Sequence, residues 1–172
     1  TKFLPDFPTQ GHTVTIHQLL NHTSGIKSYT SIESVMARGY CNNTSHEEVL
    51  SWFKDEPFDF DPGTKWKYNN SGYYLLGLII EKASGKSYGE YVQEALFTPL
   101  GLSRTRIDSV NDVIVNRAQG YQVIDDGAFA HDQAIEPSIP FSAGAIIASA
   151  KDMVRWQQAL HGGKVVSADS YK

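Results

Sequence analysis

Apolar residues recur with helical spacing along most of the chain, so the sequence predicts a mainly α-helical protein. The longest of these runs, residues 71–83, is apolar nearly all round, which is typical of a helix that its neighbours enclose. Gly85 is placed to end this helix, because glycine commonly follows the last helical residue. We therefore expect residues 71–83 to form the axis of the core.

Five shorter helices are predicted around this axis, most of them from capping residues and helix stops. A serine with a glutamate three residues later, as in Ser45 with Glu48, has the spacing of a capping box. A proline disfavours the helical conformation of the residue before it, so Pro57 and Pro99 mark helix ends. The expected helices run from Thr15 to Gly25, from Ser31 to Arg38, from Ser45 to the residue before Pro57, from Ser87 to Phe97, and from Ser149 to Gly162.

The helical pattern weakens between Arg106 and Pro140. β-branched residues gather there at 113–115 and 123–124, and Asp125-Asp126-Gly127 has the composition of a turn. We expect a few short strands around 106–140 and otherwise loop. The whole chain of 172 residues, 41% of them hydrophobic, suits a single core, so we expect one helical domain over residues 1–172.

Composition and charge exclude several classes of partner. The formal net charge is −4, from 15 basic and 19 acidic residues without a basic cluster, so nucleic acid is not an expected partner. The longest apolar run, residues 73–80, is far short of the roughly 20 residues that cross a bilayer, so no transmembrane segment is expected. Cys41 is the only cysteine, which excludes an intrachain disulfide. Residues 1–5 lack a start methionine and a signal-peptide pattern, so we expect a fragment of a longer polypeptide.

The strongest candidate chemistry lies between Asp61 and Gly77. In an extended segment, Tyr68 and Asn70 point to one side while Lys67 and Asn69 point to the other. A phenol and a carboxamide held beside a buried helix suit proton transfer and carbonyl recognition. Tyr68 would need nearby cations to act as a base, because a phenol has a pKa of about 10. The alternative is that the Tyr68 ring packs and Asn70 caps the helix.

Ser24 and Lys27 fit the S-x-x-K pattern of enzymes in which a lysine activates a serine nucleophile. Such a serine opens a buried helix, whereas here Gly25 follows directly and the apolar face comes before the motif. We therefore interpret Ser24 to Lys27 as the C-terminal turn of a helix.

Neither metal nor cofactor chemistry is predicted. His12, His17 and His22 recur every five residues, which places them about 140° apart on a helix, so they cannot share a metal ion. The other three histidines, His46, His131 and His161, are isolated in the sequence. We interpret all six as capping or surface residues.

Small residues at 142–145, Ser-Ala-Gly-Ala, precede the last predicted helix. They would let a substrate approach the backbone closely, and they would equally suit close helix packing. The sequence leaves both interpretations open.

Three segments together, residues 15–25, 62–77 and 142–160, resemble the serine β-lactamase and penicillin-binding-protein family. The resemblance is closest to its class C-like branch, which also holds DD-peptidases and esterases. It implies an α/β sheet domain that carries a mostly helical lobe, with the active site between them. This chain resembles the helical lobe, so the missing sheet domain is an implied partner. An extracytoplasmic location is also implied by the resemblance.

Members of the family use an S-x-x-K serine and lysine, a Tyr-x-Asn, and a Lys or His with Gly on a strand. By resemblance, Tyr68 would shuttle a proton between nucleophile and leaving group, and Asn70 would hydrogen-bond the substrate carbonyl and the activating lysine. Ser24 is not at the family's nucleophile position, so the nucleophile is expected upstream of Thr1. The expected activity of the parent is acyl transfer from a β-lactam, a D-alanyl peptide or a small ester, and the chain alone is expected to be inactive.

Two other functions stay open at this stage. The chain could belong to a penicillin-binding or sensor module that has lost catalysis, or it could be an independent helical structural domain. The sensor module predicts a parent without the nucleophilic serine or its lysine. The structural domain predicts that Tyr68→Phe leaves every function of the parent intact.

Overall fold

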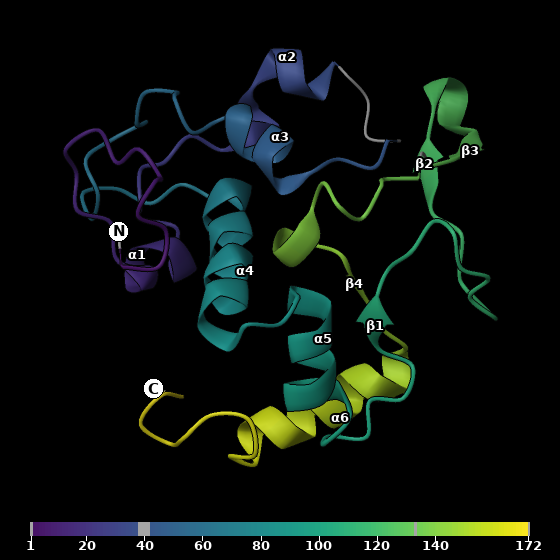
Figure 1. Cartoon of the computed structure of the whole chain (residues 1–172). Helices are drawn as coiled ribbons and strands as arrows, with labels where there is room; N and C mark the ends of the chain where they lie inside the picture. Colours follow the sequence, from purple (N-terminus) through teal and green to yellow (C-terminus); the bar gives the residue numbers. More distant parts are fainter. Residues whose placement is uncertain (1, 38–41, 133, 172) are drawn as a thin grey trace.

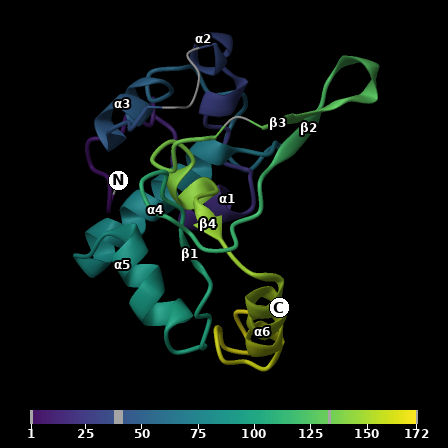
Figure 2. The same cartoon turned by 90° about the vertical axis from the view of Figure 1, so that its right-hand side faces the viewer.

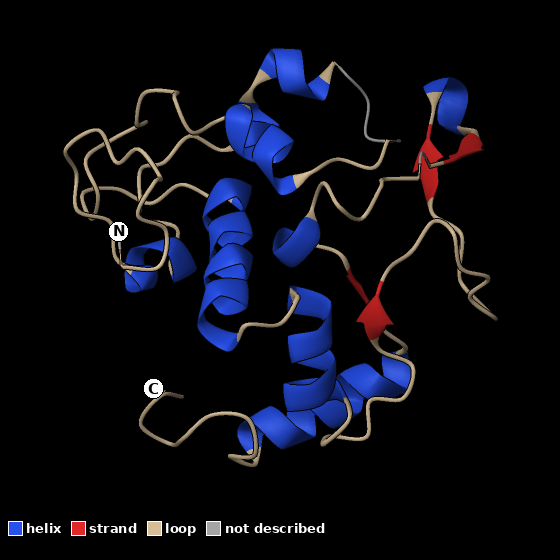
Figure 3. Ribbon diagram, in the orientation of Figure 1, coloured by secondary structure: helices blue, strands red, loops and turns tan. Residues whose placement is uncertain are grey.

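The computed structural model describes residues 2–37, 42–132 and 134–171, and helices dominate it (Figures 1 and 3). The α-helices are α1 (Ile16–Leu20), α2 (Glu33–Met36), α3 (His46–Ser51), α4 (Asn70–Ser84), α5 (Tyr88–Val92) and α6 (Ala150–His161). Four shorter turns complete the helical part: the 3-10 turns η1 (Tyr29–Ser31), η3 (Asp125–Gly127) and η4 (Phe141–Ala143), and the π-helical turn η2 (Gln93–Phe97), which prolongs α5. The prediction of a helix-rich chain with few short strands is confirmed.

Helix α4 is the centre of the molecule, as predicted. No residue from Ser71 to Ile80 is exposed, and α1, η1, α5 and η4 all contact the helix (Figure 1). Asn69 caps its first turn, with its Oδ1 accepting a hydrogen bond from the backbone N–H of Gly72 at 2.8 Å. Gly85 ends the helix in the left-handed conformation, with φ 71°.

Two groups of buried apolar side chains flank α4. The larger joins α1, α3 and the N-terminal half of α4, and the smaller joins α5, η2 and the residues that follow them. Their buried members are Leu19, Ile26, Tyr29, Val35, Val49, Phe53, Tyr74, Leu75, Leu78 and Ile139 in the first, and Tyr88, Val92, Phe97 and Leu102 in the second. Phe141 of η4 packs against both groups, so η4 links the two parts of the core.

The strands form two separate antiparallel pairs. β1 (Arg106–Ile107) pairs with β4 (Ile146–Ile147), and β2 (Tyr121–Val123) pairs with β3 (Phe129–His131). Three of the four lie within the predicted region 106–140, whereas β4 lies beyond it. The β2–β3 hairpin extends away from the helices, and η3 forms its turn as predicted (Figure 2). Residues 113–115 form no strand, and Val113 is 94% exposed, so its side chain has no apolar face to pack against.

The predicted helix starts are more accurate than the ends. Thr15 and Gln18 form a reciprocal capping box at α1, but the helix ends at Leu20 and not at Gly25. His22 then adopts a left-handed conformation, with φ 61°, which is incompatible with a continuing α-helix. The helix expected over 31–38 is η1 followed by α2, and Arg38 lies outside the described residues.

Glycine is required inside α4 at Gly77. A Cβ at this position would overlap Ser142 and the Phe141 ring. Ser142 Oγ donates a hydrogen bond to the Tyr73 carbonyl at 2.7 Å. Ser142 therefore packs closely on a helix, which is one of the two interpretations that the small residues at 142–145 left open. Among the described helices, none combines the length and the apolar character that a membrane span requires.

Candidate functional site

Tyr68, Asn69 and Asn70 form the entrance to α4, but the boundary differs from the prediction. Asn70 is the first residue of α4, so the extended conformation reaches only Asn69, whose φ and ψ are −148° and 110°. The argument that Tyr68 and Asn70 share one side of an extended segment therefore does not apply. Asn69, not Asn70, caps the helix, which leaves the Asn70 carboxamide free for another role.

The Asn70 side chain is fixed by the loop that follows α1. Its Nδ2 donates to Thr30 Oγ1 at 3.1 Å, and its backbone N–H donates to Ser28 Oγ at 3.2 Å. The two hydroxyls of Ser28 and Thr30 are themselves 3.0 Å apart. Among the described residues, none hydrogen-bonds Asn70 Oδ1. The carboxamide is thus oriented while one N–H and its oxygen remain available to a ligand.

Tyr68 is 58% exposed, and no described residue hydrogen-bonds its hydroxyl. Its ring contacts the His22 ring, with 4.7 Å between the ring centroids. An accessible phenol on a packed ring can exchange a proton with a bound molecule, which is the chemistry expected for Tyr68.

His22 was not predicted as a site residue, yet it lies at the centre of this entrance. Its ring is half-buried, stacks on the Tyr73 ring at 5.0 Å, and accepts the backbone N–H of Asn69 on Nδ1 at 3.2 Å. The interpretation of His22 as a capping or surface residue is therefore wrong. The signal was its position one residue before Thr23-Ser24-Gly25 in the segment that carried the family resemblance.

The two lysines nearest this entrance are held by one carboxylate. Asp59 Oδ1 lies 3.0 Å from Lys27 Nζ, and Asp59 Oδ2 lies 2.6 Å from Lys67 Nζ. Burial raises the pKa of the Asp59 carboxyl, but the hydrogen bonds and charges of Lys67 and Lys27 outweigh it and lower the pKa below its ordinary value. Asp59 is therefore ionised at neutral pH and neutralises part of the positive charge beside Tyr68.

Ser24 is 1% exposed, and its Oγ has no hydrogen-bond partner among the described residues. A serine needs both access and a base to attack a substrate, so this geometry does not suit a nucleophile. The interpretation of Ser24 to Lys27 as a helix C-terminal turn is nevertheless wrong, because α1 ends four residues earlier. These residues form a loop.

That loop is locked against residues 59–67 by backbone hydrogen bonds. Asp59 N–H donates to the Gly25 carbonyl at 2.7 Å, and Gly63 N–H donates to the Thr23 carbonyl at 2.8 Å. Gly25 has a φ of 74°, and a Cβ there would overlap the Phe60 carbonyl oxygen. The close approach explains the glycine, and it buries Ser24.

A second S-x-x-K match, Ser51 with Lys54, did not enter the sequence analysis. Both residues are exposed, and they lie at the end of α3. Ser51 Oγ donates to the Glu48 carbonyl at 2.6 Å within that helix. The serine is thus engaged by its own helix, and the motif follows the helix instead of opening it.

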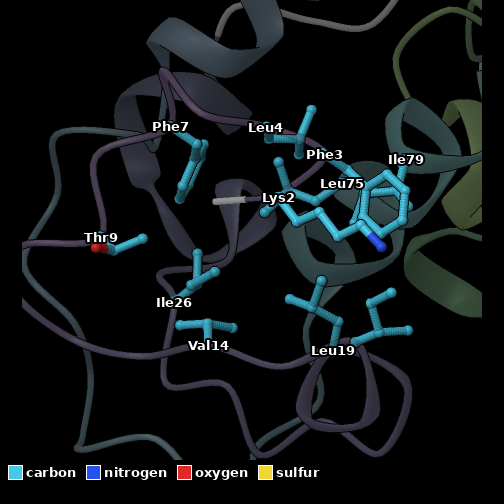
Figure 4. A pocket seen from close by; sticks show the side chains of 11 residues that line it. Lys2, Phe3, Leu4, Phe7, Thr9, Val14, Leu19, Ile26, Leu75 and Ile79 are labelled. Carbon is cyan, nitrogen blue, oxygen red and sulfur yellow. The ribbon is translucent and has the colours of Figure 1, made fainter. Parts of the chain in front are cut away.

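An apolar cavity of about 320 Å³ lies elsewhere, between the N-terminal segment, α1 and α4 (Figure 4). Its lining includes Phe3, Leu19 and Leu75, and Lys2 is its single ionisable residue. Such a surface can bind apolar groups but offers no acid–base pair. Within the described part of the chain, no group of three or more His, Cys, Asp or Glu side chains is arranged to hold a metal ion.

Comparison with known proteins identifies the family. A profile of the beta-lactamase family, described as Beta-lactamase, matches residues 1–172. Penicillin-binding protein 4* of Bacillus subtilis is 40% identical over 113 residues, which cover 62% of this chain and 23% of that protein.

Solved structures agree with this assignment. A D-stereospecific amidohydrolase from Streptomyces sp. superposes with a TM-score of 0.88 at 27% identity, covering 99% of this chain and 54% of the other. A penicillin-binding protein from Bacillus halodurans gives 0.83 at 30% identity, covering 96% and 51%. This chain spans about half the length of these structures. The chain belongs to the beta-lactamase family, whose members and relatives here are serine hydrolases and penicillin-binding proteins.

Proposed function

We propose that this chain is the helical lobe of a serine hydrolase that acts on β-lactams, D-alanyl peptides or small esters through an acyl-serine intermediate. We further propose that the 172 residues alone do not turn over substrate. The observation that carries the proposal is the pairing, at the entrance of α4, of an accessible Tyr68 hydroxyl with the oriented carboxamide of Asn70. The family membership of the chain supports the same reaction class.

Each residue has a definite part in this reaction. Tyr68 takes the proton of the attacking serine and returns it to the leaving group, so that no net charge develops on the leaving atom. Asn70 keeps one N–H on Thr30 and can donate the other to the substrate carbonyl. Its Oδ1 can accept from the ammonium group of an activating lysine.

The chain does not provide the remaining groups within the described site. Ser24 is buried, and Lys27 and Lys67 are both bound to Asp59. A phenol needs a nearby cation to become a base near neutral pH, and Asp59 neutralises the two closest ones. We therefore propose that the nucleophilic serine and its lysine come from a part of the full-length protein outside these residues.

The substrate class follows from the relatives by analogy. One structural relative is a D-stereospecific amidohydrolase and another is a penicillin-binding protein. A β-lactam and a D-alanyl peptide both present an amide carbonyl, which the free N–H of Asn70 can bind. We propose a substrate with a D-configured residue on the acyl side of this amide, with small esters of the same shape as alternatives.

The test uses the full-length protein that carries this chain. It is incubated with a fluorescent penicillin and with a chromogenic D-alanyl substrate, as wild type, Tyr68→Phe, Asn70→Ala and the control Tyr121→Phe. Tyr121 is similarly exposed but lies on the β2–β3 hairpin. We expect labelling and turnover in the wild type and the control, and loss of about 10²–10⁴-fold in the Tyr68→Phe acylation rate.

Other outcomes would replace this function. A stable adduct without turnover would indicate a penicillin-binding or sensor module. No labelling by any compound, with unchanged behaviour of Tyr68→Phe, would indicate a structural domain.

A further inference from the structure

His22 holds the Tyr68 segment at three points. Its backbone carbonyl accepts the N–H of Lys67 at 3.0 Å, and its Nδ1 accepts the N–H of Asn69 at 3.2 Å. Its ring also contacts the ring of Tyr68 itself, at 4.7 Å between centroids. The residues on both sides of Tyr68 are thus bound to one histidine, 46 positions earlier in the chain.

The hydrogen bond to Asn69 fixes the chemical form of the ring. A backbone N–H can only donate, so Nδ1 must carry a lone pair and the ring proton must be on Nε2. A second proton would turn Nδ1 into a donor that faces another donor. The contact with Asn69 would then be repulsive, and the entrance to α4 would lose one of its three attachments.

The surroundings of the ring do not provide a carboxylate that would retain a protonated form. The rings of Trp66, Tyr68 and Tyr73 face it, with centroid distances of 6.1, 4.7 and 5.0 Å, and the two phenols are the titratable groups among them. The neighbouring charge, on Lys67, is bound to Asp59. Within the described residues, no acidic side chain forms an ion pair with His22.

We propose that His22 is a positioning residue for the Tyr68 hydroxyl, and that it acts only as the neutral Nε2–H form. The role of Tyr68 in this inference rests on the proposed function. Acidification protonates His22, releases the Asn69 N–H and displaces Tyr68 relative to Asn70. Acylation therefore declines on the acid side because of His22, in addition to any effect of the reacting groups.

The left-handed backbone at His22 offers matched variants. Asparagine tolerates a φ of 61°, and its Oδ1 takes the place of the histidine Nδ1 without titrating in this range. His22→Asn therefore keeps the acceptor and removes the proton switch. His22→Phe keeps a ring beside Tyr68 and removes the acceptor. His17→Asn changes an exposed histidine on α1 and serves as the control.

The first measurement is independent of activity. The full-length protein is labelled with ¹⁵N-histidine and ¹⁵N-asparagine, and its NMR spectrum is followed from pH 8 to pH 5 in wild type and His22→Asn. We expect the Nε2–H tautomer for His22 at pH 8, and an Asn69 amide shift that follows the protonation of His22. An Nδ1–H tautomer, or an Asn69 amide that moves equally in His22→Asn, would overturn the inference.

The second measurement is the pH profile of the acylation rate. At pH 8, we expect His22→Asn to remain within about threefold of wild type and His22→Phe to fall about tenfold to a hundredfold, because a small misplacement of a reacting group has such a cost. The acid limb of His22→Asn should move to lower pH, while His17→Asn follows the wild type. An unchanged acid limb in His22→Asn would contradict the role of His22. Absence of acylation in every variant would instead reject the proposed function, and the NMR result would still decide the form of His22.

Discussion

Lys27 Nζ lies 3.0 Å from Asp59 Oδ1, and the same carboxylate binds Lys67 through its other oxygen. Lys27 is therefore engaged away from Ser24, although the spacing of the two residues matches an acylation motif. Asp59 also joins the loop after α1 to the segment that leads into α4. One side chain thus separates a Ser-Lys pattern from Ser-Lys chemistry and helps to position Tyr68.

Replacing Asp59 by asparagine should loosen this connection. Asp59→Asn removes two charge-assisted hydrogen bonds, and because the lysines are partly exposed we expect a loss of about 1 kcal/mol in the free energy of unfolding. Urea unfolding at pH 7 measures this loss, with Asp55→Asn, an exposed carboxylate, as the control. Equal stability of the two variants would show that the two ion pairs contribute nothing measurable.

Tyr68→Phe should separate function from stability. The Tyr68 hydroxyl has no hydrogen-bond partner among the described residues, so its removal should change the unfolding midpoint by less than about 0.5 kcal/mol. The acylation rate of the full-length protein should nevertheless fall by about 10²–10⁴-fold. Parallel loss of stability and rate would indicate that the tyrosine is a packing residue.

Gly77→Ala should destabilise the core. The new Cβ would overlap Ser142 and Phe141, and overpacking of this kind costs about 1–3 kcal/mol. The matched control is Gly89→Ala, also in an α-helix, where a Cβ would meet only the Ile107 side chain, at 3.3 Å. Both variants gain the same helix propensity, so thermal unfolding of the pair isolates the contact between α4 and η4. A Gly77→Ala midpoint at or above that of Gly89→Ala would contradict the close packing.

Asp152 should make the stability depend on pH. It is 2% exposed and accepts hydrogen bonds from Arg104 N–H at 2.7 Å and Thr105 Oγ1 at 3.1 Å. Burial raises the pKa of its carboxyl, but these bonds, together with Arg155, outweigh burial and lower the pKa below its ordinary value.

A carboxyl with a lowered pKa in the folded state stabilises the fold fully above the pKa of the unfolded chain, about 4, and loses this contribution as the pH falls through the folded value. We therefore expect the wild type to lose stability below pH 4 more steeply than Asp152→Asn. Urea unfolding between pH 2.5 and 7 tests this, and parallel curves for the two proteins would be evidence against it.

The sequence predicted those parts of the fold that depend on neighbours in the chain. The caps at Thr15, Ser87 and Ser149 were found because each involves a residue three positions away. The central helix was found because its apolar pattern is continuous. The end of α1 was missed, since the left-handed conformation of His22 depends on contacts with residues 66–73.

The candidate site shows the same limit. Tyr68 and Asn70 were singled out from their local pattern, and their catalytic roles remain a proposal. Their supports were not foreseen, because Thr30 and His22 are 40 and 46 residues away from the groups they bind. The short strand β4 was likewise missed, because a two-residue strand exists only through its partner β1.

Intact-mass spectrometry of the 172-residue chain after incubation with a reactive penicillin tests the central claim most directly. Samples of Ser24→Ala and Ser51→Ala are measured in parallel. The account predicts an unmodified mass in all three, because neither serine has the access and the lysine that acylation requires. A stoichiometric adduct on the wild type that disappears in either variant would show that this chain contains a working nucleophile, and would contradict the assignment of the nucleophile to another part of the full-length protein.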